Sequence, residues 1–197
     1  MQNVQNNDFG SFSQMNAFAM QHGVVLGAVG ILTMACSVLS LTYDSANLVF
    51  WFLLILSFVV ARRLTMRYRD VSGYDLERGF PFSKAFAHTF LMGLYAGLWV
   101  ALATFVYLQW FDHGHVFTAL EAQLSRPEML EAFRQTFPAE MLDVESPETL
   151  PATVVSLMRA SSPASHAIGV LYMNLFAAPV VSAVIALLSF RRPQHTA

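Results

Sequence analysis

The sequence predicts an all-α integral membrane protein: a bundle of four transmembrane helices with an amphipathic helical segment outside the membrane, between the third and fourth spans. Three observations predict it. The chain is 55% hydrophobic and only 12% charged, with a mean hydropathy of +0.48, whereas soluble domains are about 25% charged. Four long runs contain no Asp, Glu, Lys or Arg, and six of the eleven basic residues gather between Arg62 and Lys84.

The uncharged runs cover residues 9–43, 45–61, 85–111 and 160–190. A charge at the bilayer centre costs roughly 3 kcal/mol on insertion scales, so lipid explains such runs better than a soluble bundle of unusually buried helices does. About 20 apolar residues cross the hydrocarbon, and three of the runs exceed that length. The second run is shorter and spans if the arginines that follow it reach toward the headgroups. The expected spans are residues 17–41, 46–64, 84–111 and 163–190.

The first half of the chain alternates spans with short connections. Residues 1–16, rich in Gln and Asn, are expected to form a disordered cytoplasmic tail ahead of a membrane domain over 17–192. "TYDSAN" predicts a tight turn between the first two spans, and the second helix is expected to continue into "RRLTMRYR". A loop with Gly73 and Gly79 follows, and Ser83 is the expected N-cap of the third span.

The outer segment, residues 112–162, differs in composition. It carries eight acidic residues against three arginines. Ser125 and Glu128 have capping-box spacing around Pro127, and the apolar residues that follow recur at helical intervals, which predicts a short amphipathic helix. A second helical stretch is expected after Ser146, and Ser162 with proline after it predicts the cap of the fourth span.

The positions of the arginines predict which side of the membrane each loop faces. Lys and Arg in short loops remain on the cytoplasmic side of a membrane, and attraction to anionic headgroups suits a basic cluster at a helix end. Four spans put the 62–84 loop and both termini on that side, and the acidic outer segment on the other. The expected location is a bacterial inner membrane, with both termini cytoplasmic. The residues that carry this prediction are Arg62, Arg63, Arg67 and Arg69.

Small residues at helical spacing predict close helix packing, because missing side chains let backbones approach where lipid offers no hydrophobic driving force. They serve contacts within one bundle or, as the alternative, a homodimer face. Asn174 and Pro179 predict a kinked, polar place in the fourth span, either on a transport path or as a static kink. The expected packing residues are Gly23, Gly27, Gly93, Gly97, Ala178 and Ser182.

From the titratable side chains we expect no catalytic residue, no cofactor-binding site and no metal site. His22 and His88 could meet at one depth, although polar residues near the interface are the simpler interpretation. "DHGH" at 112–115 brings Asp112, His113 and His115 together, with Glu121 as a conjectural fourth ligand, but zinc also needs second-shell support, so metal binding is the less favoured interpretation. Cys36 is the single cysteine, which excludes an intramolecular disulfide.

Short motifs carry a family resemblance. "YRD" follows the second expected span, "GFPFSKAF" leads into a glycine-containing third span, and the closing "NLFAAPVVSAVIALLSFRR" contains a proline and ends in a basic pair. These resemble the family called domain of unknown function forty-one ninety-nine, a group of small four-span bacterial membrane proteins. The resemblance covers about residues 23–192, with Arg78-Gly79 standing where the pattern has a glycine pair. It implies an architecture and no activity.

We therefore expect a protein that is not an enzyme and has no cofactor. Its expected role is that of a structural or accessory subunit that acts through helix–helix or outer-segment contacts. A small passive channel or carrier, with Asn174 and Pro179 near the path, is the alternative. The lipid bilayer is the expected partner, together with a homo-oligomer or another membrane protein. Nucleic acid is excluded, because the basic loop lies at the membrane.

Overall fold

The computed structural model describes residues 11–74, 79–136 and 150–193. Within these ranges the regular structure is helical, as the sequence predicts, apart from one isolated bridge between Phe80 and Arg191. The seven helices are α1 (Phe12–Ser40), α2 (Asp44–Val71), α3 (Phe82–Trp110), α4 (His115–Leu124), α5 (Pro127–Thr136), α7 (Leu150–Ala160) and α8 (Pro163–Ser189).

Four of these helices are long and apolar enough to cross a membrane. The most apolar stretches of α1, α2, α3 and α8 have mean hydropathies of 1.8 to 2.1, yet only 11 to 22% of their residues are buried within the protein. The apolar side chains on their outer faces therefore need lipid around them. The structure thus has the four candidate membrane-spanning helices that the sequence predicts, which supports a multi-pass membrane protein.

Capping explains where the helix ends differ from the expected ones. α1 begins at Phe12, inside the expected 1–16 tail, because the Ser11 hydroxyl accepts a hydrogen bond from the Gln14 N–H at 3.2 Å. Residues 1–10 lie outside the described part of the chain. The prediction that Ser83 caps the third span is wrong, since α3 begins at Phe82 after Pro81. The prediction for Ser162 is confirmed: its hydroxyl accepts from the Ser165 N–H.

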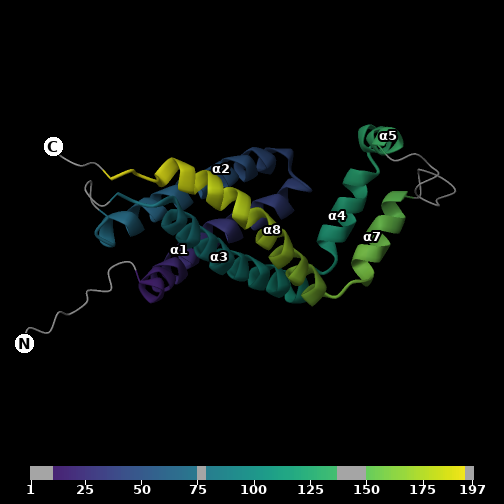
Figure 1. The fold of residues 1–197 in the computed structure, drawn as a ribbon. Helices are drawn as coiled ribbons and strands as arrows, with labels where there is room; N and C mark the ends of the chain where they lie inside the picture. Colours follow the sequence, from purple (N-terminus) through teal and green to yellow (C-terminus); the bar gives the residue numbers. More distant parts are fainter. Residues whose placement is uncertain (1–10, 75–78, 137–149, 194–197) are drawn as a thin grey trace, which may run out of the picture.

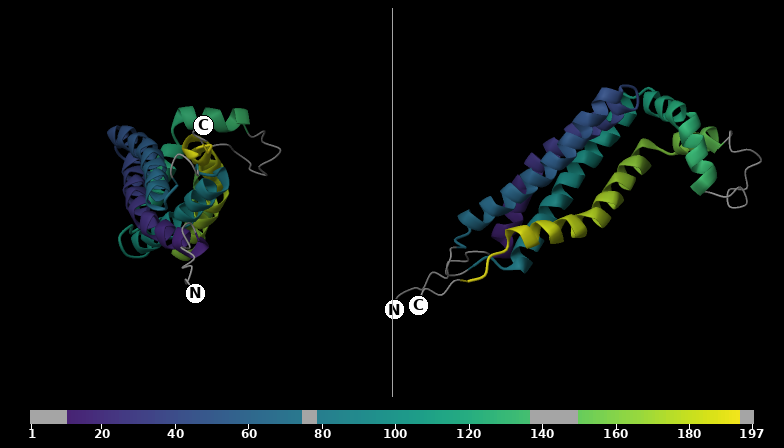
Figure 2. Two further views of the ribbon diagram at one scale, coloured as in Figure 1. Left: turned by 60° about the vertical axis from the view of Figure 1, so that its left-hand side comes forward. Right: turned by 90° about the horizontal axis from the view of Figure 1, so that it is seen from above.

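Helix α3 lies at the centre of the bundle, and its most extensive contacts are with α1 and α8. α2 packs mainly against α1. The start of α1 and the end of α8 lie at one end of the bundle, and α4, α5 and α7 lie beyond the other (Figures 1 and 2). The buried apolar clusters lie toward the first end. They comprise Met15, Tyr68, Phe80, Ala85 and Ala186, and next to them Ala19, Ala61, Met92 and Ile185.

A clasp, formed by Phe80 and Arg191, fastens the beginning of α3 to the end of α8. The Phe80 N–H donates to the Arg191 carbonyl at 2.8 Å, and the Arg191 N–H donates back at 3.0 Å. Gly79 makes the clasp possible, because its φ of +66° is a conformation that favours glycine. A Cβ at this position would also lie only 2.6 Å from the Arg191 carbonyl oxygen.

Two short helices, α4 and α7, pack against each other beyond the end of the spans. α4 is not predicted from the sequence. Its start is fixed by Asp112, whose carboxylate accepts hydrogen bonds from the N–H groups of Gly114 and Val116. α5 begins at Pro127, where an amphipathic helix is predicted, while Ser125 closes α4. Residues 137–149, which include Ser146, lie outside the described ranges.

Candidate functional site

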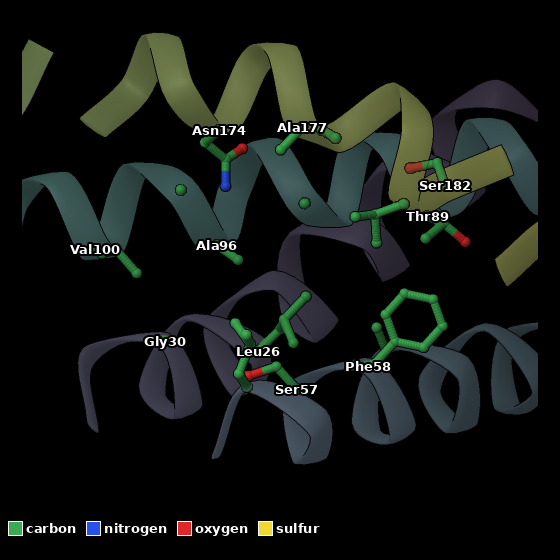
Figure 3. Close-up of a pocket in the computed structure, with 16 residues that line it drawn as sticks. Leu26, Gly30, Ser57, Phe58, Thr89, Ala96, Val100, Asn174, Ala177 and Ser182 are labelled. Carbon is green, nitrogen blue, oxygen red and sulfur yellow. The ribbon is translucent and has the colours of Figure 1, made fainter. Parts of the chain in front are cut away.

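A cavity of about 450 Å³ lies between the four spans (Figure 3). Its walls are almost entirely apolar, and none of its lining residues carries a charge. The helices supply Leu26 and Gly30 from α1, Leu54, Ser57, Phe58 and Ala61 from α2, Thr89, Gly93, Ala96, Gly97 and Val100 from α3, and Asn174, Ala177, Ala178, Val181 and Ser182 from α8.

Small residues account for the empty space. Where α3 faces α8, Gly93 lies opposite Ala178, and a Cβ at Gly93 would be 3.7 Å from the Ala178 Cβ. Gly97 lies opposite Asn174, and a Cβ there would come within 2.5 Å of the Asn174 Cγ. The Asn174 side chain therefore occupies the place that the side chain of residue 97 would take. The absence of a side chain at 97 allows a polar group at this depth.

Asn174 contributes a side-chain amide to the cavity wall. Its Oδ1 is buried and accepts no hydrogen bond, which is costly in a membrane interior. In Figure 3 its amide points from α8 toward the space across which Leu26, Ser57 and Phe58 lie. The Ser57 hydroxyl instead donates to the Leu53 carbonyl at 2.8 Å, and Thr89 donates to the Ala85 carbonyl at 2.8 Å.

Pro179 lies inside α8, five residues after Asn174, and α8 bends near its middle in Figure 2. Proline lacks the N–H that would bond the Leu175 carbonyl, and its ring crowds that carbonyl. Pro179 itself is exposed and is not among the residues that line the cavity. Of the two residues expected near a transport path, only Asn174 therefore lines the cavity.

A pair of buried histidines lies next to the cavity, on the side toward the start of α1. His22 Nδ1 and His88 Nε2 are 3.2 Å apart, and the two rings meet edge to face. The His88 ring also stacks on the Tyr68 ring with a centroid separation of 4.3 Å and an interplanar angle of 1°. One imidazole must donate its N–H to the other, so the tautomers of the two rings are linked.

Two threonines connect this histidine pair to the cavity. Thr65 Oγ1 lies 3.5 Å from His88 Nδ1 and 2.9 Å from Thr89 Oγ1, and Thr89 lines the cavity. The polar contacts thus run from Thr89 in the cavity wall to Thr65 on α2, back to His88 on α3, and from there to His22 on α1. The sequence allows the two histidines to meet at one depth but does not point to Thr65 and Tyr68, which lie on the same helical face, three residues apart.

The remaining glycines of the expected packing faces lie between α1 and α3. A Cβ at Gly23 would be 2.5 Å from the Tyr95 Cβ, and one at Gly27 would be 2.9 Å from the Trp99 Cβ. The helices approach too closely for any larger residue without a shift. Ala178 and Ser182 are buried on α8, and both also line the cavity.

The four arginines expected to face headgroups do not share one environment. Arg62, Arg63 and Arg67 are exposed. Arg69 is buried, and its guanidinium donates to the Asp70 carboxylate through Nε at 2.8 Å. The Arg69 side chain is therefore held in an ion pair, and its expected contact with headgroups stays a prediction.

Two side chains of "DHGH" contact other groups of the protein. The Asp112 carboxylate caps α4, and His115 Nε2 lies 3.3 Å from the Thr42 hydroxyl. Among the residues that the structure describes, no three His, Cys, Asp or Glu side chains gather as metal ligands would.

Comparison with known proteins gives one match. The family model described as "Protein of unknown function (DUF4199)" matches residues 21–191. No curated protein and no solved structure matches the chain.

Proposed function

The chain belongs to the DUF4199 family of proteins of unknown function, and from that premise we propose that it is a non-enzymatic carrier in a bacterial inner membrane. It binds a neutral, lipid-soluble molecule in the cavity between its four spans. The single observation that carries this proposal is the Asn174 amide, whose nitrogen points toward a mostly apolar cavity and whose Oδ1 has no hydrogen-bond partner (Figure 3). Of the two functions that the sequence allows, this observation favours the carrier.

The cavity limits the chemistry of its ligand. A volume of about 450 Å³ is in the range of small-molecule sites. A charged ligand is disfavoured, because none of the lining residues carries a charge to compensate it. The amide nitrogen that points toward the cavity is a donor, so the ligand has an apolar body with one oxygen that accepts, as in the hydroxyl group of an alcohol or a phenol.

Photolabelling tests the proposal. The purified protein in lipid nanodiscs is exposed to an aliphatic alcohol with a diazirine in its chain, and labelled peptides are identified by mass spectrometry. Residues around the cavity are expected to be labelled. Asn174→Leu removes one hydrogen bond, worth about 0.6 to 1.5 kcal/mol, so the alcohol concentration for half-labelling rises about three- to tenfold.

Two controls isolate the hydrogen bond. Ser57→Ala removes a cavity hydroxyl that is bonded within its own helix, so the labelling is expected to stay unchanged. The matching diazirine alkane lacks the hydroxyl group and is expected to label the original protein and Asn174→Leu equally. Labelling by the alcohol that does not respond to Asn174→Leu would contradict the role of Asn174.

An accessory role is the second candidate, favoured by the surface of α7. Beyond the spans, α7 exposes Val154, Leu157 and Met158, with Leu157 at 67% of its full exposure. Such a surface suits the outer part of a membrane-protein partner or a second copy of this chain. Purification in mild detergent is expected to recover a stoichiometric partner that Leu157→Gln releases. If the chain purifies alone and monomeric, the accessory role fails.

A further inference from the structure

We propose that the apolar pocket beneath α4 and α7 is a second binding site for the same class of molecule, continuous with the cavity between the spans. This inference rests on the proposed function. The pocket, called here the outer pocket, has a volume of about 240 Å³ and is bounded by α1, α3, α4, α7 and α8. Its wall includes Met34, Thr104, Phe117, Met158 and Val170.

One face of α8 lines both spaces. Ser182, Ala178 and Asn174 line the cavity, and Val170 and His166 line the outer pocket. These residues follow one another at intervals of four, which places them in one row along the helix. From Ser182 to His166 the row is about 24 Å long at 1.5 Å per residue, against about 30 Å for the hydrocarbon thickness.

Two further helices repeat the pattern. On α1, Leu26 and Gly30 line the cavity, and Met34 with Val38, one turn further in each case, lines the outer pocket. On α3 the row of cavity residues ends at Val100, and Thr104, one turn beyond it, lines the outer pocket. The two spaces are therefore successive parts of one groove along α3, between α1 and α8.

Different helices close this groove at different depths. α2 contributes residues to the cavity, whereas α4 and α7 contribute residues to the outer pocket. α7 is held to the start of α8 at this place, since His166 Nε2 lies 3.0 Å from the Met158 carbonyl oxygen. The outer pocket is thus an apolar chamber between the spans and the outer helices.

Met34 and Thr104 form the layer between the two spaces. The Thr104 hydroxyl lies 3.0 Å from the Met34 sulfur and also donates to the Val100 carbonyl at 2.9 Å. A methionine side chain is unbranched and flexible, so it can change rotamer without moving the backbone. Asn174 lies one turn from Val170, which makes it the last polar group before this layer. A hydroxyl-bearing molecule that leaves Asn174 passes Met34 to reach the outer pocket.

The diazirine alcohol tests continuity in the full chain in nanodiscs. In the original protein, labels are expected both in the cavity, on α8 between Ala177 and Val181, and in the outer pocket, on α4 between Val116 and Leu120. Met34→Phe fills the layer with a rigid ring, so the outer label is lost while the cavity label remains. Thr104→Val, which keeps the side-chain volume, is the matched control and leaves both labels in place.

Each failure has its own pattern. Absence of the cavity label in the original protein defeats the proposed function, and a cavity label without an outer label defeats only the second site. An outer label that survives in folded Met34→Phe shows that the outer pocket fills independently, which overturns continuity. Should Met34→Phe melt at a much lower temperature than the original protein, Met34→Ala replaces it. Its wider passage is expected to raise the outer label relative to the cavity label, and no rise overturns continuity.

Discussion

His22 on α1 and His88 on α3, 66 residues apart in the chain, bring Nδ1 and Nε2 to within 3.2 Å of each other inside the bundle. Both side chains are buried, and Phe18 and Tyr68 lie against the rings. A buried imidazole without a partner would leave a polar nitrogen unsatisfied. The pair therefore joins α1 and α3 at a buried position, where a water molecule cannot take the place of the partner ring.

The first prediction concerns the strength of this contact. His22→Leu and His88→Leu are each expected to lower the free energy of unfolding in detergent by about 1 to 3 kcal/mol, since each leaves the facing ring nitrogen of the other histidine without its partner. In the double variant the interaction energy is expected to be about 0.6 kcal/mol, with about 1.7 as an upper bound. Thermal unfolding of the four proteins gives this double-mutant cycle.

Tyr68→Phe is the control for the histidine cycle. It keeps the ring that stacks on His88 and removes a buried hydroxyl that has no hydrogen-bond partner. We expect little change, or a gain in stability. If the two histidine substitutions change the free energy of unfolding by strictly additive amounts, the two rings stabilise the bundle by packing alone and not by their contact with each other.

The second prediction compares two glycines on one face of α3. Gly97→Ala places a Cβ 2.5 Å from the Asn174 Cγ, so α3 and α8 must separate or Asn174 must move, whereas at Gly93 the nearest atom is an ordinary 3.7 Å away. Gly97→Ala is expected to lower the free energy of unfolding by about 1 to 3 kcal/mol, the usual range for overpacking. Gly93→Ala is expected to be neutral or stabilising.

Restoring the space tests the cause. In Gly97→Ala combined with Asn174→Ala, the smaller residue at 174 makes room for the new methyl group, and most of the lost stability is expected to return. If the double variant is less stable than Gly97→Ala alone, the collision between 97 and 174 is not the reason for the loss.

The third prediction concerns the clasp at the end of the bundle. Gly73 and Gly79 both have positive φ, of 70° and 66°, but a Cβ at Gly73 meets nothing within 4 Å while one at Gly79 meets Arg191 and Pro193. In Gly73→Ala only the positive φ is unfavourable, which is expected to lower the free energy of unfolding by about 1 to 2 kcal/mol. Alanine at Gly79 adds the collision and is expected to open the clasp.

Hydrogen exchange measures this difference. The Phe80 and Arg191 amides, which are bonded across the clasp, are expected to exchange faster in Gly79→Ala and at the original rate in Gly73→Ala. Equal protection in both variants would mean that the C-terminal end of α8 does not depend on the clasp.

The fourth prediction fixes the orientation. In a Cys36→Ser background, Ser125→Cys is expected to react with an impermeant thiol reagent on intact spheroplasts, and Val71→Cys only after lysis. Both positions are exposed in the structure, with Val71 at 53%. Ser72, its neighbour, would be a poor reporter because it is buried. The opposite labelling would reverse the bundle in the membrane.

The spans could be predicted because the cost of burying charge in lipid leaves long uncharged runs, and each run corresponds to one long helix. Helix ends were less predictable. Ser162 acts as a cap as expected, whereas Pro81 rather than Ser83 precedes α3, because neither serine nor proline alone determines which residue has the extended backbone of an N-cap. α4 was missed, since its start depends on the Asp112 carboxylate.

The candidate site was predictable only in part. Asn174 was identified as a polar residue in an apolar span, and it does line the cavity. The cavity itself depends on which small residues face each other across two helices, and a single sequence does not contain that register. The contact between His22 and His88 was considered and set aside, because nothing in the spacing of residues on one helix fixes the rotation of another.

The clasp and Pro179 together give α8 two unlike halves. Its C-terminal half is fastened to Phe80 and packs into the buried clusters through Ile185 and Ala186. Its N-terminal half, beyond the proline, exposes large side chains such as Met173 and Phe176 to lipid. Both halves expose apolar side chains, including Leu187 and Leu188 after the proline, but only the N-terminal half lacks the clasp, so membrane thickness and lateral pressure displace that half more. In a thinner bilayer that half would lean over, and the width of the groove would follow the lipid composition.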